Sequence, residues 1–230
     1  MNEVIWTDVA PRDGLLNIAD TISTDAKVRL VRGLLGAGVP RVEATSFVSP
    51  RWVPQLADAA AALAAFEADV ARLRVLVPNL RGLELALAHG MRNVLVTIAA
   101  TDSFNRRNVN RSVDESLEEI THIVALASER GCTVDVAISV SFGCPFEGRV
   151  APERVVRLCA DLAKRGDVET ERDKLHAHRP VGAKYPCLVR AVRLGRATRT
   201  TTRRHAPSCF PFFDVYPTVY WLDSSSEIWP

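Results

Sequence analysis

Short apolar runs and amphipathic stretches alternate along the first two thirds of this chain. The apolar runs predict strands at 3–9, 41–47, 73–79, 93–100 and 133–141. The stretches between them place apolar residues at helical spacing and predict helices at 23–38, 53–66, 80–90, 112–131 and 151–166. Strands that are almost wholly apolar, each followed by a helix, indicate a parallel sheet.

Several predicted helices carry end signals. Ser23 or Thr24 can cap the first one, and Gly38 can end it in a left-handed conformation. Ser112 and Glu115 have the spacing of a capping box, and Pro152 stands in the first turn of the last predicted helix. These signals support the element boundaries independently of the apolar pattern.

Both an open doubly wound sheet and a closed eight-stranded barrel produce this alternation. The first strand is not followed by the glycine-rich turn of a dinucleotide-binding fold. Polar residues do gather just after several strands, where barrel enzymes keep their chemistry. They are Arg12–Asp13, Thr45–Ser46, Asn79, Thr101–Ser103 and Ser141–Cys144. These observations favour, within the α/β class, a (β/α)8 TIM barrel over an open sheet, and the five βα units that are recognisable would make it incomplete.

The alternation of predicted strands and helices ends near residue 168. This divides the chain into a partial barrel, 1–168, and an irregular basic tail, 169–230. Residues 1–168 have a net charge of −2 and residues 169–230 a net charge of +4. No Asp or Glu occurs between Lys174 and Phe213. Within this region, 167–170 could begin a sixth strand and 187–195 could form a short helix.

Composition narrows the class of protein. The chain has 230 residues, of which 47% are hydrophobic and 24% charged, as in a globular protein. No apolar run approaches the ~20 residues of a membrane span, and no signal peptide is recognisable, so we expect a cytoplasmic protein. The five cysteines are an odd number without a CxxC pair, which argues against a disulfide framework or a zinc knuckle.

Arg12 and Asp13 stand side by side after the first predicted strand. Pro-x-Asp-Gly is a favourable turn sequence, so a purely local role is one interpretation. The other is chemical, because a carboxylate and a guanidinium at a strand end can hold a metal ion and an anionic substrate.

Three blocks of sequence decide between these interpretations. "APRDGLLN" (10–17), "VEATSFVSPRWVPQLAD" (42–58) and "SFGCPFEGRVAP" (141–152) resemble the 3-hydroxy-3-methylglutaryl-CoA lyases, and "FNRRNVNRSVDES" (104–116) fits the same family. The resemblance covers residues 1–168. It implies a TIM-barrel lyase that uses Mg²⁺ or Mn²⁺ and cleaves the CoA thioester to acetyl-CoA and acetoacetate, as in leucine degradation and ketone-body formation.

The resemblance also implies roles for individual residues. Asp13 becomes a metal ligand, Arg12 faces the substrate carbonyl or enolate, and Glu43 helps to order the site. Ser46 becomes a substrate contact, and Arg106 and Arg107 either reach the CoA phosphates or lie in a solvated loop. Cys144 is read as a small buried residue near the site rather than as a nucleophile. A homodimer remains open.

The sequence departs from the family after residue 168. The family's H-x-H metal ligands, its ligating Asn, its loop cysteine and its "GDT" segment are not recognisable. His176 and His178 have the H-x-H spacing but follow Cys144 too closely, so they are weak metal candidates. Leu16 stands where the family usually has Gln. The tail resembles a replaced C-terminus, and we expect a truncated chain with impaired lyase activity.

Two alternatives remain from the sequence alone. The chain could be a non-catalytic remnant, or another metal-dependent aldolase or Claisen-type barrel enzyme. The arginines and phenylalanines of the tail could contact nucleic acid, but no known binding motif frames them, so nucleic acid is not the expected partner. The expected partner is an acyl-CoA thioester, with no membrane involved.

Overall fold

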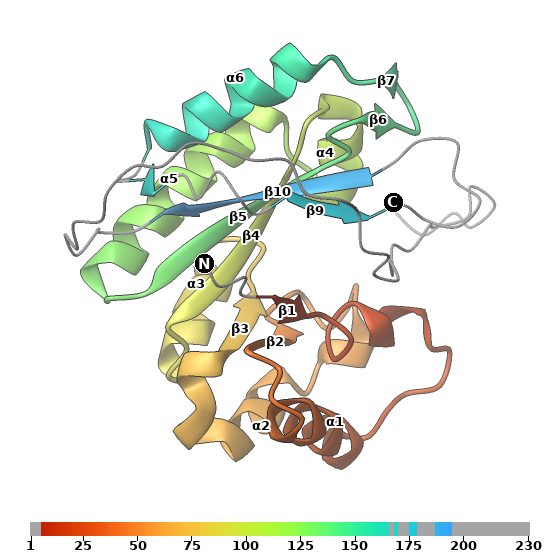
Figure 1. The fold of residues 1–230 in the computed structure, drawn as a ribbon, viewed down its shortest axis with the longest axis vertical. Coiled ribbons are helices and arrows are strands. Elements are labelled where there is room, and N and C mark those ends of the chain that lie inside the picture. The colour runs from red at the N-terminus through yellow and green to blue at the C-terminus, as the bar shows by residue number, and fades with distance from the viewer. Residues whose placement is uncertain (1–5, 166–167, 170–174, 179–186, 195–230) are drawn as a thin grey trace, which may run out of the picture.

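The computed structural model describes residues 6–165, apart from the side chain of Asn17, and the backbone of 168–169, 175–178 and 187–194. Its main sheet has the order β1-β2-β3-β4-β5-β10-β8, with β9 paired to β10 (Figure 1). The first five strands are parallel and successive in the chain, and they curl as in an incomplete TIM barrel. They are β1 (Thr7–Asp8), β2 (Arg41–Ser46), β3 (Leu73–Leu76), β4 (Asn93–Ala99) and β5 (Thr133–Ser139).

The main helices connect these strands. They are α1 (Thr24–Gly36), α2 (Ala59–Leu63), α3 (Leu80–Ala88), α4 (Asp102–Val109), α5 (Val113–Glu129) and α6 (Pro152–Ala163). Three 3₁₀ segments accompany them: η1 (Gly14–Asn17), η2 (Pro54–Leu56) and η3 (Ala64–Arg72). A two-stranded hairpin, β6 (Gly143–Cys144) and β7 (Gly148–Arg149), follows β5.

Most of the predicted end signals are confirmed. The Ser23 side chain accepts a hydrogen bond from the Ala26 N–H, and Ser112 and Glu115 form the reciprocal capping box of α5. Gly38 has φ +85°, as expected for a residue that ends a helix in the left-handed region. Asn79 caps α3 by accepting from the Gly82 N–H at 2.9 Å, which gives this strand-end residue a structural task.

The sequence was wrong about the conformation of three segments and about the pairing of a fourth. The helix expected over 53–66 is broken into η2, α2 and η3, and α4 lies where a loop was expected. Residues Cys187–Leu194 form the strand β10 rather than a short helix. The segment expected to begin a sixth parallel strand contributes β8 (Val168–Glu169), which pairs antiparallel with β10.

β10 runs antiparallel to β5, with Arg190 opposite Ile138 and Leu194 opposite Val134. β9 (Leu175–His178) continues the sheet on the other side of β10. The edge of β5, where a sixth parallel strand would pair in a barrel, is thus occupied by a strand of opposite direction. The backbone groups along this edge are paired all the same.

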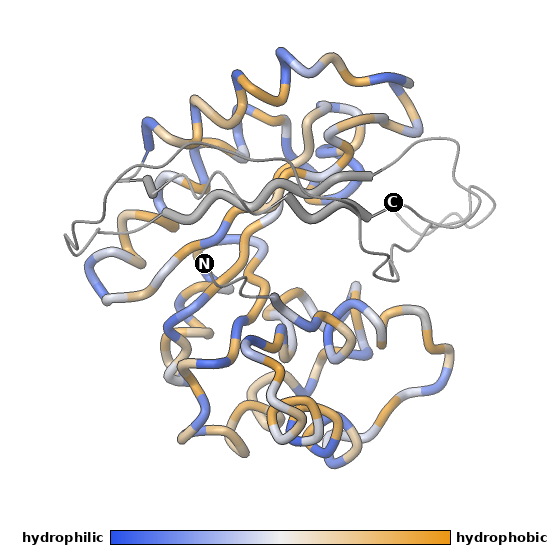
Figure 2. The backbone as a smooth tube through the Cα atoms, in the orientation of Figure 1, coloured by the Kyte–Doolittle hydropathy of each residue, from blue (hydrophilic) through white to orange (hydrophobic). Residues whose placement is uncertain are grey.

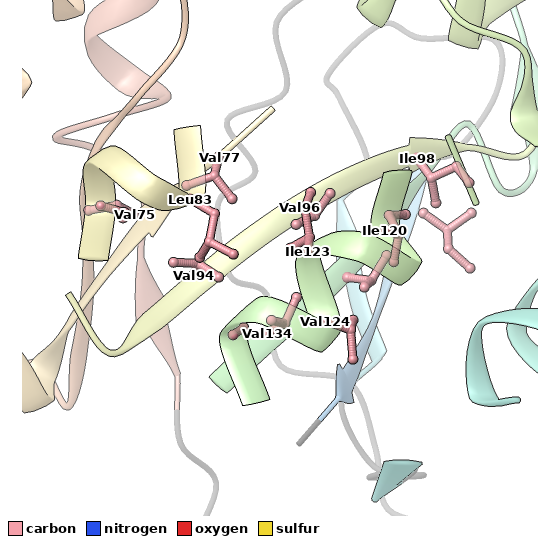
Figure 3. Close-up of a cluster of buried hydrophobic side chains, with 14 of the residues drawn as sticks. Val75, Val77, Leu83, Val94, Val96, Ile98, Ile120, Ile123, Val124 and Val134 are labelled. Atoms are coloured by element: carbon pink, nitrogen blue, oxygen red, sulfur yellow. The ribbon is translucent and has the colours of Figure 1, made fainter. Parts of the chain in front are cut away.

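The hydrophobic core lies between the outer face of the sheet and the helices. Alternate strand residues such as Val75, Val94 and Val134 belong to one buried cluster with Leu83 of α3 and Ile120 of α5 (Figure 3). Burial of each such side chain contributes roughly 1.5–3 kcal/mol of transfer free energy. The tube in Figure 2 is coloured as mostly apolar along β4.

The opposite face of the strands differs in character. It carries a small apolar cluster of Leu76, Leu95 and Ala137 and, one step earlier along β3 and β5, the charged residues Arg74 and Asp135. Both charged side chains are buried. Among the residues described, no helix combines the length and apolarity needed to cross a membrane.

Candidate active site

Arg12 lies in a tight turn directly after β1. The carbonyl of Val9 accepts hydrogen bonds from the N–H groups of Arg12 at 3.1 Å and Asp13 at 2.7 Å. Buried Leu15 anchors the η1 segment that follows. The turn is therefore fixed by its own backbone, and the side chain of Arg12 is left to contact groups on neighbouring strands.

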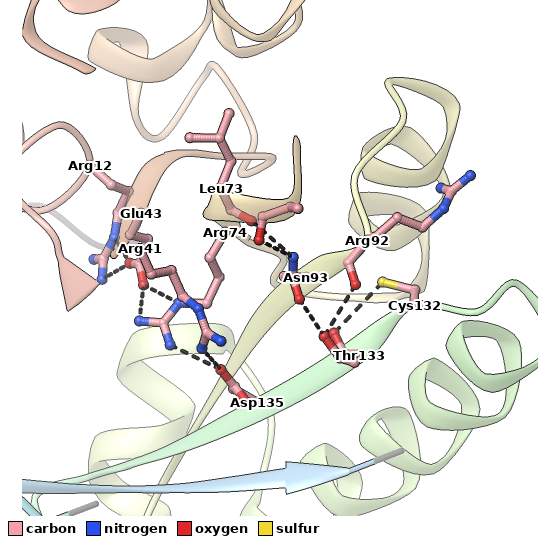
Figure 4. A network of polar contacts seen from close by, with 11 residues as sticks. Arg12, Arg41, Glu43, Leu73, Arg74, Arg92, Asn93, Cys132, Thr133 and Asp135 are labelled. Atoms are coloured by element: carbon pink, nitrogen blue, oxygen red, sulfur yellow. Dashed lines mark hydrogen bonds and ion pairs between the residues drawn. The ribbon is translucent and has the colours of Figure 1, made fainter. Parts of the chain in front are cut away.

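The Arg12 guanidinium lies between two carboxylates. Its Nε donates to Oε1 of Glu43 at 2.5 Å, its Nη2 forms an ion pair with the same oxygen, and its Nη1 contacts Oδ1 of Asp13 (Figure 4). The Glu43 side chain is 0% exposed, whereas those of Arg12 and Asp13 are 16% and 25% exposed. Arg12 thus joins a fully buried carboxylate to one that solvent can reach.

Glu43 stays ionised despite its burial. Burial raises the pKa of this carboxyl, but the charges and hydrogen bonds of Arg12 and Arg74 outweigh that effect and leave the pKa below its ordinary value. Arg74 donates to Oε2 from Nε at 3.0 Å and from Nη2 at 2.6 Å. Each carboxylate oxygen of Glu43 therefore has its own guanidinium.

The structure brings together the three residues that sequence reasoning placed at the centre of the site. Asp13 and Glu43 both contact Arg12, and Glu43 lies in the middle of β2 rather than at its end. Ser46 is the last residue of β2 and is 2% exposed. His176 and His178 lie in β9, where side chains fall outside the described structure.

A second polar cluster surrounds Cys144 in the β6–β7 hairpin. Its Sγ accepts from the Thr101 hydroxyl at 3.1 Å and from the Phe146 N–H at 3.5 Å. Burial raises the pKa of this thiol, but these hydrogen bonds, together with those from Glu147 and Ser103, lower it overall. The expectation of a buried cysteine is confirmed, since Cys144 is 1% exposed.

The hairpin is tied to α4 by polar and aromatic contacts. Glu147 accepts from the Ser103 hydroxyl at 2.6 Å, and its other oxygen accepts from Arg154 at 2.9 Å. The backbone before the hairpin passes through Val140, whose φ of 51° is unusual for a β-branched residue. A strained residue at this point fixes the direction in which the chain leaves β5.

Arg106 and Arg107 lie on α4 rather than in a loop, and both are exposed. The guanidinium of Arg107 lies over the ring of Phe146 at 4.4 Å from its centroid. Buried Asn105 on the same helix donates to the Ser116 hydroxyl at 2.7 Å and accepts from the Ala99 N–H at 2.9 Å. α4 is therefore held rigidly against β4 and α5, with its arginines outward.

Sequence reasoning missed Arg74 and Asp135. Arg74 Nη1 donates to Oδ2 of Asp135 at 3.1 Å, and Arg41 Nη1 donates to the same oxygen at 3.3 Å (Figure 4). The available signal was a single charged residue inside each of two otherwise apolar runs, "LRVLV" and "VDVAI". A charge in such a run has to be paired if it is buried.

The described residues do not provide a complete set of metal ligands. Asp13 offers a hard oxygen donor, but no group of three or more His, Cys, Asp or Glu side chains in the described part of the chain could surround an ion. Glu43, the nearest other carboxylate of the site, has both oxygens committed to arginines. The described residues thus supply one candidate ligand, Asp13, and do not by themselves complete a metal site.

Comparison with known proteins identifies related chains. Residues 3–171 match the family model described as HMGL-like. The chain is 46% identical over 166 residues to the (R)-citramalyl-CoA lyase of Chloroflexus aurantiacus, covering 67% of this chain and 52% of that protein. It is 41% identical over 182 residues to the hydroxymethylglutaryl-CoA lyase of Pseudomonas mevalonii, covering 78% and 60%.

Solved structures give the same result. The HMG-CoA lyase of Brucella melitensis superimposes with a TM-score of 0.66 at 36% identity, over 70% of this chain and 57% of that one. An HMG-CoA lyase from Acinetobacter baumannii, in complex with coenzyme A and 3-methylmalate, gives a TM-score of 0.65 at 28% identity, covering 69% and 52%. The chain spans between half and three fifths of the length of these relatives.

Proposed function

Because the chain belongs to the HMGL-like family, we propose that its site acts on an acyl-CoA thioester by carbon–carbon lyase chemistry. The proposed reaction cleaves 3-hydroxy-3-methylglutaryl-CoA to acetyl-CoA and acetoacetate. The observation that carries the proposal is the fixed Arg12 guanidinium between Asp13 and buried Glu43.

Arg12 suits the electrostatic demand of this reaction. Cleavage of the carbon–carbon bond leaves an enolate on the thioester fragment, and a preorganised positive group near that oxygen stabilises the transition state. A guanidinium has five N–H donors, so Arg12 can donate to a substrate oxygen while keeping its contacts to Glu43 and Asp13. Glu43 holds the guanidinium in place, and Ser46 is proposed as a substrate contact.

The CoA moiety would lie toward α4 in this proposal. Arg106 and Arg107 are exposed on that helix, and a guanidinium can pair with a phosphate through two parallel hydrogen bonds. Exposed Phe146 beside Arg107 offers an apolar surface at the same place. This assignment rests on position and charge.

The metal of the proposed reaction is Mg²⁺ or Mn²⁺, as the resemblance implies. When bound, such an ion lowers the pKa of the substrate hydroxyl. Asp13 is the single carboxylate we propose as a ligand, and a hard divalent cation prefers about six oxygen ligands. Since the described residues do not complete that shell, we propose that the chain binds the ion weakly and that its lyase activity is impaired.

A relative with a different named substrate gives a second candidate for the acyl group. The relative from Chloroflexus aurantiacus at 46% identity is a citramalyl-CoA lyase. Leu16, 40% exposed beside the Arg12 turn, stands where the lyases that the sequence resembles usually have Gln. We propose citramalyl-CoA as the second candidate substrate, with cleavage at the same type of bond.

The experiment measures acetoacetate and acetyl-CoA released from 3-hydroxy-3-methylglutaryl-CoA with excess Mg²⁺ or Mn²⁺. A parallel assay under the same conditions measures acetyl-CoA released from citramalyl-CoA. We expect turnover at least roughly a hundredfold below that of an intact relative, because groups that act as a unit fail together. Residual turnover should vanish in Arg12→Met. Turnover within about tenfold of an intact relative would contradict impairment, and none with either substrate would mark a non-catalytic remnant.

The cellular setting is part of the same proposal. We propose a cytoplasmic location, as expected from the sequence, and a role in leucine degradation or ketone-body formation, as the resemblance implies. A homodimer is also proposed. Fractionation of cells and light scattering of the purified chain test these two points separately from the enzymatic assay.

A further inference from the structure

Five charged side chains form one continuous chain of contacts across the inner face of the sheet. Arg12 contacts Glu43, Glu43 contacts Arg74, Arg74 contacts Asp135, and Asp135 contacts Arg41 (Figure 4). The contacts connect the turn after β1 with β2, β3 and β5. With Asp13, which contacts Arg12, the described members of the network are three arginines and three carboxylates.

The network is arranged so that each oxygen of Glu43 serves one partner. Oε1 accepts from Arg12 and Oε2 accepts from Arg74 through both Nε and Nη2. With Oε2 engaged, the Glu43 carboxylate cannot rotate to offer both oxygens to Arg12. Arg74 therefore determines the orientation of the carboxylate, and with it the direction in which the Arg12 guanidinium points.

Asp135 fixes the orientation of the Arg74 guanidinium in the same way. Its Oδ2 lies 3.1 Å from Nη1 of Arg74 and 3.3 Å from Nη1 of Arg41. A planar guanidinium held at Nη1 by one carboxylate and at Nε and Nη2 by another cannot turn about its own axis. The position of Arg74 is thus defined from two strands, β2 and β5.

A role in stability alone explains the network poorly. Removing two charges from water costs several kcal/mol per ion, and apolar residues in place of a buried ion pair are often as stable. The next layer of the same face, Leu76, Leu95 and Ala137, shows that apolar side chains fit there. Arg74 is 9% exposed and Asp135 8% exposed, so both carry a large part of the cost of burial.

We infer that Arg74 and Asp135 are positioning residues that set the orientation of Arg12 through Glu43. The inference rests on the proposed function in one point: the orientation of Arg12 matters for catalysis because Arg12 is the residue proposed to face the thioester oxygen. Neither residue touches the substrate in this scheme. Their effect is to hold the guanidinium in one orientation before any ligand arrives.

The test follows the Arg12 Nε–H by nuclear magnetic resonance in the full chain without substrate. The rate of hydrogen exchange at this group reports how often its contact with Glu43 opens. We expect Arg74→Met to raise the exchange rate roughly tenfold or more, and Asp135→Asn to raise it by a smaller factor. Arg74→Lys should keep the positive charge but should not protect the Arg12 Nε–H from exchange. An ammonium lacks the planar set of N–H donors with which the guanidinium contacts both carboxylates.

Arg72→Met is the matched control. Arg72 precedes the same strand and donates from Nη2 to the carbonyls of Leu35 at 2.9 Å and Val39 at 2.6 Å, away from Glu43. It should lower the free energy of unfolding while leaving the Arg12 exchange rate unchanged. Unchanged exchange at Arg12 in Arg74→Met, or full protection in Arg74→Lys, would overturn the inference.

Two features keep the result interpretable. If Arg74→Met does not fold, the milder variant Asp135→Asn still tests whether the network orients Arg12. An unaltered exchange rate of the Arg12 Nε–H in folded Asp135→Asn contradicts the inference. The readout needs neither turnover nor a metal ion. An inactive chain with the expected exchange pattern would therefore refute the proposed function and leave the positioning role intact.

Discussion

At the scale of single residues, the buried carboxylate of Glu43 is the group on which the site depends most. Replacing it with Gln leaves Arg12 and Arg74 without their shared counter-charge, and removing one partner of a buried ion pair is strongly destabilising. We expect Glu43→Gln to lower the free energy of unfolding by about 3 kcal/mol, measured by urea denaturation. The control Glu67→Gln, at an exposed position, should stay within about 0.5 kcal/mol of the wild type.

The same carboxylate predicts a pH dependence. The two arginines hold the pKa of Glu43 below the ordinary value of 4.5 against the opposing effect of burial. A group whose pKa is lowered by folding adds stability above its ordinary pKa, and that contribution is lost as the pH falls through the lowered value. The stability difference between wild type and Glu43→Gln should be constant near neutral pH and shrink below pH 4.5. A difference that grows on acidification would contradict the assigned charge state.

Asp13, as the one proposed carboxylate ligand, leads us to expect that the chain binds metal ions weakly. With one carboxylate ligand in the described part of the chain, Mn²⁺ should bind with a dissociation constant of about 1 mM or weaker, measured by electron paramagnetic resonance. Asp13→Asn should abolish that binding, and Asp20→Asn, at an exposed position nearby in the chain, should not. Tight binding that survives Asp13→Asn would direct attention to His176 and His178.

At the scale of elements, two glycines in helices predict opposite results. A Cβ on Gly82 of α3 would lie 2.8 Å from Cδ of Pro78 and 3.3 Å from the carbonyl oxygen of Phe47, whereas one on Gly33 of α1 would meet nothing within 4 Å. Alanine favours a helix over glycine by about 1 kcal/mol. We expect Gly33→Ala to raise the melting temperature and Gly82→Ala to lower it. Similar shifts in both variants would contradict the close packing of α3 on the β2 side.

The sequence predicted the elements whose apolar pattern is local. The five parallel strands and α1, α3, α5 and α6 all correspond to runs or stripes that need no partner to be recognised. α4 was missed because "DSFNRRNV" has no apolar stripe, and it is fixed instead by buried Asn105 and its bonds to β4 and α5. β10 was missed because its conformation comes from pairing with the distant edge of β5.

The residues of the site also fall into a part that local sequence predicted and a part that it did not. Arg12, Asp13 and Glu43 were predicted because each stands in a block that resembles a known family, and the structure brings them into contact. Arg74 and Asp135 lie 61 positions apart in the sequence, and only strand pairing makes them neighbours. Long-range register is not readable from one sequence, so the part of the network that positions Arg12 could not be predicted.

At the scale of the whole molecule, large apolar side chains are exposed in the segments that follow the strands. Leu16, Ile18, Trp52, Phe142 and Phe146 are each 40–47% exposed. Apolar surface of this kind binds hydrophobic dyes. We expect the folded chain to increase the fluorescence of anilinonaphthalene sulfonate at neutral pH and to form aggregates seen by light scattering. A monodisperse sample with a sharp melt and no dye binding would contradict this expectation.

The strand order has a consequence for how the protein forms during its synthesis. From β1 to β5, each strand pairs with the one made just before it. Every new βα unit can therefore add to a partner that has already left the ribosome, over a short length of intervening chain, which favours rapid closure. The edge of β5 then stays open until Cys187–Leu194 has been made, about fifty residues later. The moment of greatest risk for misassembly falls in that interval, when the newest parallel strand has no neighbour on one side.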